Sequence, residues 1–426
     1  MAHAETLAEA LASAWRSNPT IAAERARQRA TKELKAQAWA AALPQVSADA
    51  GYSRLKDTQT RSATVFGPGG TDTVTLNPAD AAVDGAVPVF NGFRNVNAIR
   101  QAQARIRAGG AELIAVEQDI LRQAAGAYFD VLRDTTIYES NLNNVEVLLR
   151  QKDDARLRFD VGEVTKTDVA QADARLAQSR SGLAVAQAEL AVSRARYAEL
   201  IGAPPGTLDP APKLPDLPET LDAAQALAAE YAPPVVAARG SEEASRRDVA
   251  IAKGAMLPTV SLTAGYRYAD EPSTFVTRDE QWSYGVRASV PLFTGGHNLS
   301  RIREARALHD RAEHRLDEAE RRAEADVASA FERHVAAGIA IRSATAQLEA
   351  NELALDGVRR EAQIGTRSTI DVLNAEQEYL DSRVALANAL RDERVAAFAL
   401  LAAAGLLTPG AAGVDVDAGE EKRGAP

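Results

Sequence analysis

The chain has 426 residues, of which 46% are hydrophobic and 25% charged, and its formal net charge at pH 7 is −10. This acidic balance argues against nucleic acid as the main partner, because little basic surface remains to neutralise phosphates. Without any cysteine, the chain has no disulfides, thiolate metal sites or cysteine nucleophile.

The first residues resemble the end of an export signal. Ala2, His3 and Ala4, directly before Glu5, have the small-x-small form of a signal-peptidase site. This pattern predicts export, although a plain cytosolic start fits the same residues. No apolar run reaches the length of about 18 residues that a membrane-spanning helix needs.

The sequence contains a long internal duplication. Residues 43–52 (LPQVSADAGY) return at 257–266 (LPTVSLTAGY), an offset of 258 − 44 = 214. Residues 87–92 (VPVFNG) return at 290–295 (VPLFTG), an offset of 290 − 87 = 203 that holds for the rest of the unit. The offsets differ by 214 − 203 = 11, so one connection is 11 residues shorter in the second copy. A duplication of this length predicts a pseudo-symmetric architecture.

Two short stretches in each copy alternate apolar and polar residues. They lie at about 44–52, 80–88, 258–268 and 282–290. A period of two places each kind of side chain on its own face, so these stretches are predicted strands. Pro78 and Asp84 blur the pattern before 88, and the repeat partner supports a strand there.

Long helical stretches follow the strands, at 94–159 and 168–201 and again at 298–363 and 371–404. The first helix of each pair lacks proline and would extend about 100 Å at 1.5 Å per residue. Many alanines permit close contact between helices. A soluble coiled-coil scaffold explains these helices and stays an alternative.

The strands need a different explanation. About 9–11 residues is the length of a strand that crosses a bilayer in a β-barrel, and four strands cannot close a barrel, so several chains must contribute. Aromatic residues gather in or beside the strands, as at membrane interfaces; they are Tyr52, Phe66, Phe90, Phe93, Tyr266, Tyr268, Phe275, Trp282, Tyr284 and Phe293. Exposed strands of a β-sandwich are the alternative.

Each copy runs strand, Val-Pro-(Val/Leu)-Phe-x-Gly, long helix, then (Val/Ile)-Gly-x5-Asp-Val at 161–169 and 364–372. This order resembles the outer membrane efflux protein (TolC) family over about Leu7 to Gly405. The resemblance implies a mixed α and β fold, in which long antiparallel helices form a periplasmic α-barrel. Each protomer of a homotrimer would give four strands to one shared transmembrane β-barrel in the outer membrane.

The resemblance also implies a function without enzymatic chemistry or cofactors. The protein would be an exit duct for small-molecule efflux or type I secretion of proteins. A periplasmic adaptor and an inner-membrane transporter of the ABC or RND type would dock on it. A periplasmic adaptor is itself an alternative, although it would have one helical hairpin rather than two and no alternating strands.

The parts of the chain follow from this comparison. The first repeat is expected at 5–202 and the second at 221–407, with a linker at 203–220 that joins a belt around the helices and a disordered tail at 408–426. The stretches 53–79 and 269–281 are expected as external loops that absorb the 11-residue difference. Strand is expected to turn into helix at four corner residues, which are Pro88, Gly92, Pro291 and Gly295.

The helix turns are predicted to form the periplasmic entrance. Gly162 and Gly365 would break the first helix of each pair, and a cap would open the second. The expected caps are Thr167, Asp168 and Asp371.

By resemblance, Asp168 would pair with Arg367, Thr167 would add a hydrogen bond, and Asp371 would contribute three symmetry-related carboxylates. This chain departs from the family where Asn374 replaces a second aspartate and Ala362 a tyrosine. A weaker tie and a single acidic ring are therefore expected.

Other constellations carry no chemistry in the sequence. His309 and His314 are five apart on a helix and face different directions, so no metal site is expected. The acid pair Glu242 and Glu243 is expected to be solvated surface charge. The sequence contains no phosphate-binding loop or catalytic triad pattern, so an enzyme is not predicted.

Overall fold

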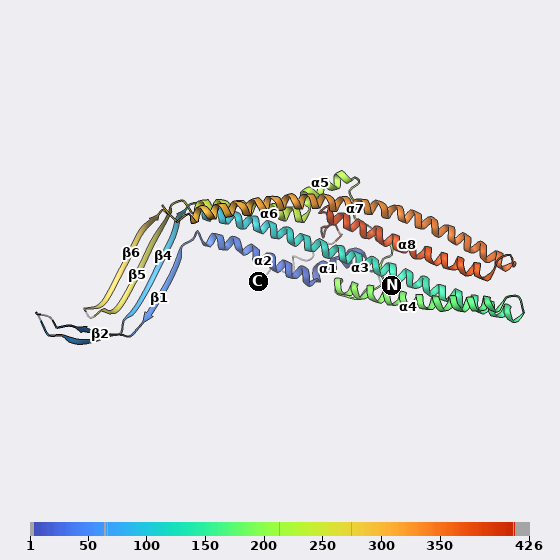
Figure 1. The fold of residues 1–426 in the computed structure, drawn as a ribbon, viewed down its shortest axis with the longest axis horizontal. Coiled ribbons are helices and arrows are strands. Elements are labelled where there is room, and N and C mark those ends of the chain that lie inside the picture. Colours follow the sequence, from blue (N-terminus) through green and yellow to red (C-terminus); the bar gives the residue numbers. More distant parts are fainter. Residues whose placement is uncertain are drawn as a thin grey trace. The chain divides into compact units, whose positions relative to one another are not determined.

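The computed structural model describes residues 4–411 and 413, except Thr64, Phe66, Lys213 and Thr274. Most of the expected tail therefore lies outside the described residues. In chain order the elements are α1 (Leu7–Ser17), α2 (Pro19–Ala40), β1 (Gln45–Tyr52), β2 (Leu55–Arg61), β3 (Gly70–Leu76), β4 (Ala79–Asn91), α3 (Arg94–Asp160), α4 (Lys166–Ile201), α5 (Leu221–Tyr231), α6 (Pro233–Gly254), β5 (Thr259–Ser273), β6 (Val276–Ser289), α7 (His297–Gln363) and α8 (Thr369–Ala403) (Figure 1).

The duplication is visible element by element. The helices α1 and α5 have 11 residues each, α2 and α6 have 22 each, and α3 and α7 have 67 each. The helices α1, α2, α5 and α6 were not predicted, although signals for the start of a helix are present in the sequence. Thr6 and Glu9 form a capping box, and Pro19 and Pro233 occupy the first helical position.

The compact units of the chain cut across the repeats. One unit contains the chain up to Gln28, residues 109–238 and the chain from Leu316 onward; the other contains Arg29–Ala108 and Arg239–Arg315. Each unit draws on both repeats, so the predicted repeat boundaries at 202 and 221 are not boundaries between compact units. The second unit holds the strands β1 to β6 of the described residues, and the first holds the turns between α3 and α4 and between α7 and α8.

Four strands form an antiparallel sheet in the order β1-β4-β5-β6, and β2 and β3 form a separate two-stranded sheet. Directly opposite residues share a face, and Val83 lies opposite Tyr266, which lies opposite Trp282. The rings of Tyr266 and Trp282 are 4.6 Å apart. On the other face Asp84 lies opposite Gly265. The sheet therefore has one apolar and one polar face, as the alternation predicted.

The two external stretches differ from expectation. Residues 53–79 were expected as a loop, but β2 and β3 form a hairpin there, and hydroxyl groups bond across it between Thr58 and Thr73 at 3.2 Å. Threonine is polar yet β-branched, so it favours a strand despite its polarity. The stretch 269–281 was also expected as a loop. Most of it is strand instead, because β5 continues to Ser273 and β6 begins at Val276.

The largest core of the first unit lies where α1, α3, α4 and α8 meet. Its aromatic members are Tyr128, Phe129, Tyr197 and Phe398, all at most 2% exposed. The Tyr128 hydroxyl donates to the backbone oxygens of Glu5 and Asp209, each at 3.0 Å, and burial raises the pKa of Tyr128 well above its ordinary value. These bonds fix the N-terminal segment and the linker to α3.

The linker also pairs directly with the start of the chain. The backbone N–H of Glu5 donates to the backbone oxygen of Thr207 at 2.8 Å, and the backbone N–H of Asp209 donates to the backbone oxygen of Glu5 at 3.0 Å. The N-terminal segment and the linker are therefore joined by backbone hydrogen bonds, and the expected belt stays a prediction. None of the described helices carries an apolar run long enough to cross a membrane.

Candidate functional site at the helix turns

The turn between α3 and α4 is a Schellman motif. The backbone N–H of Gly162 donates to Phe159 at 2.9 Å, and that of Glu163 donates to Arg158 at 2.9 Å. Gly162 has φ 82°, in the left-handed region that a side chain disfavours. Glycine is therefore required here by the backbone alone, as the sequence indicated.

The turn between α7 and α8 repeats this geometry. The N–H of Gly365 donates to the backbone oxygen of Ala362 at 3.1 Å, and the N–H of Thr366 donates to the backbone oxygen of Glu361 at 3.0 Å. Gly365 has φ 78°. A Cβ at either glycine would meet no atom within 4 Å. Neither turn depends on a neighbouring element for its shape.

Capping boxes open both second helices. The Asp168 N–H donates to the Thr165 hydroxyl at 3.3 Å, and the Thr165 N–H and hydroxyl donate to the Asp168 carboxylate at 2.8 and 2.7 Å. Ser368 and Asp371 repeat this arrangement, with a hydroxyl–carboxylate distance of 2.7 Å. The capping role of both aspartates is confirmed, but the N-cap residues are Thr165 and Ser368. The predicted cap Thr167 is an exposed second residue of α4.

The caps also set the charge of the two carboxyls. The hydroxyl and N–H of Thr165 lower the pKa of Asp168 below its ordinary value, and those of Ser368 lower the pKa of Asp371. Both groups are therefore ionised at neutral pH, which keeps negative charge at each turn.

Arg367 does not contact Asp168 within the protomer. Its Nε donates to Glu361 Oε2 at 2.8 Å, and this carboxylate raises the pKa of Arg367. The Asp168 carboxylate is meanwhile occupied by Thr165. The expected pair is thus not formed in the single chain, because each partner is satisfied inside its own turn. The sequence did not suggest Glu361 as a partner, although it lies only six residues before Arg367.

Asn374 makes a bond that the sequence did not suggest. It is exposed on α8, and its Oδ1 accepts from Arg175 Nη2 of α4 at 2.8 Å. This contact connects the second helices of the two hairpins. Residues 199 apart carry no local signal of such a contact.

Ion pairs join the two helices of each hairpin further along. In the second hairpin Arg359 of α7 pairs with Glu376 of α8 at 2.6 Å, and the Glu376 side chain is 5% exposed. In the first, Lys152 of α3 pairs with Asp173 of α4 at 3.2 Å, and Asp173 is 54% exposed. Glu376 and Asp173 are equivalent in the duplication, since 376 − 203 = 173.

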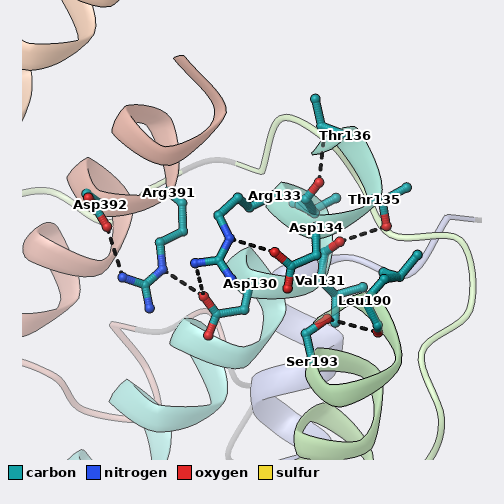
Figure 2. A network of polar contacts seen from close by, with 11 residues as sticks. Asp130, Val131, Arg133, Asp134, Thr135, Thr136, Leu190, Ser193, Arg391 and Asp392 are labelled. Carbon is teal, nitrogen blue, oxygen red and sulfur yellow. Dashed lines mark hydrogen bonds and ion pairs between the residues drawn. The ribbon is translucent and has the colours of Figure 1, made fainter. Parts of the chain in front are cut away.

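A further network joins the repeats through α3 and α8 (Figure 2). Arg391 of α8 donates to Asp130 of α3 at 2.8 Å, and Arg133 contacts both Asp130 and Asp134. Asp134 is buried, and its carboxylate holds the pKa of Arg133 above the ordinary value.

The strand-to-helix corners are only partly as expected. Gly92 has φ 67°, and a Cβ there would clash with the backbone oxygen of Gly254, so only glycine fits. Pro88 was expected at this corner, but it lies inside β4, where a bulge separates it from Phe90. Pro291 and Gly295 lie between β6 and α7. A bulge lets the strand accept a proline and continue.

Comparison with known proteins gives a consistent result. The family model "Outer membrane efflux protein" matches residues 10–203 and 225–406. The chain is 32% identical to the outer membrane efflux protein BepC of Brucella suis, over 97% of this chain and 88% of that one. It is 27% identical to the outer membrane protein TolC of Vibrio cholerae, over 95% and 92%. The solved structure of VceC from Vibrio cholerae has a TM-score of 0.78 at 20% identity, covering 94% of this chain and 96% of that one.

Proposed function

Because this chain belongs to the outer membrane efflux protein family, we propose that three copies of it form an export duct in the outer membrane that extends through the periplasm. The family consists of channels rather than enzymes. A soluble coiled-coil scaffold has no support once the four-stranded sheet and the family are known.

The observation that carries this proposal is the two-faced sheet with both edges open. The outer strands β1 and β6 each pair on one side only, and both are exposed along their length. Unpaired backbone groups are not tolerated in lipid, so the edges must pair with other chains. Three sheets of four strands would close one barrel of 3 × 4 = 12 strands, with the apolar face toward lipid.

The helix turns form the periplasmic entrance in this proposal. Three copies of Asp371 place like charges at one constriction, which repel one another and attract cations. Asn374 is neutral and bonded to Arg175, so the next position adds no acidic ring. The duct would be cation-selective through Asp371 alone. A tie between Asp168 and Arg367 would require these side chains to leave their present partners, Thr165 and Glu361.

The partners follow from the family and remain part of the proposal. A periplasmic adaptor and an inner-membrane transporter of the ABC or RND type would supply the cargo. Relatives carry names from both export routes, including an alkaline protease secretion protein and a pyoverdine export protein, both of Pseudomonas aeruginosa.

Planar-bilayer conductance of the detergent-purified protein tests the duct. We expect small cation-selective steps that millimolar trivalent cation blocks from the periplasmic side. Asp371→Asn should weaken this block at least tenfold, and Asn374→Asp should strengthen it by adding a second ring. Absence of channels from a folded sample would reject the duct, whereas an unchanged block in Asp371→Asn would reject only the acidic ring.

A further inference from the structure

A cluster of titratable side chains lies between α6 and α7, in the unit that carries the sheet and outside the entrance. Glu242 and Ser245 belong to α6, and His309 and Glu313 belong to α7. The side chains of Glu242 and His309 are 19% and 20% exposed, and that of Glu313 is 58% exposed. Glu242 was expected as solvated surface charge, but it faces the imidazole instead.

Ligand atoms in this cluster are close together. One atom each of Glu242, His309 and Glu313 lies within 4.8 Å of the others. His309 Nε2 is 3.6 Å from Glu313 Oε1, and His309 Nδ1 is 3.7 Å from Glu242 Oε1. The sequence did not suggest this group. His309 was considered only together with His314, which faces another direction, and Glu242 comes from a different helix, α6.

Ser245 of α6 lies beside the imidazole of His309. The Ser245 hydroxyl donates to the Glu242 backbone oxygen at 2.7 Å. The same hydroxyl lies 3.2 Å from His309 Nδ1 and contacts the ring on that side. The Glu242 carboxylate lies on the same side of the ring as Ser245.

Nε2, on the other side of the ring, faces the Glu313 carboxylate at 3.6 Å. Carboxylates therefore flank the imidazole near both of its nitrogens, and their negative charges favour a cation at this place.

We propose that Glu242, His309 and Glu313 bind a divalent zinc ion through one ring nitrogen of His309 and one oxygen of each carboxylate. Zinc bonds to imidazole nitrogen and carboxylate oxygen are about 2.0–2.2 Å, which separates tetrahedral ligand atoms by roughly 3.4 Å. The observed 3.6 Å between Nε2 and Glu313 Oε1 fits this spacing. Water would take the fourth position.

The surrounding charges are compatible with a cation. The two carboxylates offset the two charges of the ion, and Arg246 touches Glu242 only at 3.9 Å. Glu313 is four residues after His309, so both lie on one face of α7. The ion would join α6 to α7 independently of the entrance and of the cargo.

Isothermal titration of the tag-free, detergent-purified protein with Zn²⁺ tests the site. We expect one ion per chain. His309→Ala should weaken binding at least 100-fold, and Glu242→Gln and Glu313→Gln at least about tenfold each. Ser245→Ala, which removes the hydroxyl 3.2 Å from His309 Nδ1 that helps to orient the ring, should weaken zinc binding roughly tenfold.

His314→Ala is the matched control on the same helix and should leave the affinity unchanged within twofold. Absence of saturable binding at one ion per chain, or retained affinity in His309→Ala, would overturn the proposal. Should His309→Ala fail to assemble, the exposed substitution Glu313→Gln decides the question. None of these outcomes depends on conductance, so the site and the duct can fail separately.

Discussion

At the scale of single residues, the two hairpins rest on the same few groups. Gly162 and Gly365 adopt left-handed backbone, and Thr165 and Ser368 cap the helices that follow. The capping pattern Thr/Ser-x-x-Asp was legible in the sequence, since all its members lie within four residues. The partners of Arg367 and Asn374 could not be predicted from the sequence. Each of these contacts involves an arginine on the surface, which can reach several acceptors, and the folded structure determines which acceptor it contacts.

Removal of one cap should loosen the start of one helix. Thr165→Ala deletes the acceptor for the Asp168 N–H and should cost about 1 kcal/mol of local stability. Hydrogen exchange of the first turn of α4 should become about fivefold faster. Thr167→Ala, an exposed neighbour outside the box, is the control and should change nothing. Equal effects of the two substitutions would contradict the assignment of the N-cap.

The caps also predict how the turns respond to acid. The pKa of Asp168 and that of Asp371 are lowered in the folded state, so their stabilisation is fully present above the ordinary value of 3.8 and is lost as pH falls through the lower folded values. Exchange protection at both turns, corrected for the intrinsic rate, should be constant from pH 7 to 5 and fall below 3.8. A loss already at pH 5 would argue against these caps.

At the scale of elements, sequence periodicity located the long helices and three of the four strands, because each has a sustained pattern on one face. The strand at about 80–88 was predicted from its repeat partner, since Pro78 and Asp84 blur its own alternation. It failed for the hairpin of β2 and β3, where Thr58, Thr60, Thr71 and Thr73 read as polar loop but pair as strands. It also failed for Pro88, since a bulge in β4 arises from pairing with β5 and has no local signal. The short helices α1 and α5 begin after the N-cap residues Thr6 and Thr220, which were not used in predicting the elements from the sequence.

The two faces of the sheet predict opposite results for adjacent residues of β6. Tyr284 lies on the apolar face and is 90% exposed, whereas Ser283 lies on the polar face. Tyr284→Arg places a charge against lipid, at a cost of about 2–4 kcal/mol near the bilayer midplane, and should reduce the amount of assembled trimer in outer-membrane fractions. Ser283→Arg should assemble normally. Equal assembly would contradict the assignment of the faces.

The equivalent ion pairs of the two hairpins should also differ. Arg359→Ala leaves the buried Glu376 carboxylate unpaired and should cost about 2 kcal/mol, below the usual range because Arg359 is 42% exposed. Lys152→Ala breaks a half-exposed pair with Asp173 and should cost less than about 1 kcal/mol. Hydrogen exchange in α8 and α4 measures both. If the two substitutions lowered stability equally, burial of Glu376 would not determine how much its ion pair contributes.

At the scale of the whole molecule, the duplication and the two open sheet edges together indicate assembly. The sequence predicted that several chains must share one barrel, since four strands leave two edges unpaired. It did not predict the compact units, because these combine residues 29–108 with 239–315, and contacts between distant segments leave no periodic trace.

Cross-linking tests the pairing of edges. The chain has no cysteine, so introduced pairs are the only thiols. Ser47→Cys on β1, combined in turn with single cysteine substitutions at 281–287 on β6, should give covalent species of up to three chains for the residues that face each other. Ser47→Cys with Gly265→Cys on the inner strand β5 is the control and should give none. Cross-links limited to two chains would contradict a trimer.

The self-contained turns have a mechanical consequence. The hydrogen bonds that shape them run between residues at most six apart, and a Cβ added at either glycine would meet no other part of the described chain within 4 Å. Rearrangement of the surrounding helices therefore leaves the form of each tip intact, because no contact that holds it has to be broken. A docking protein would meet the same two rigid end pieces in every state of the duct, and only their mutual spacing would report whether the passage is wide or narrow.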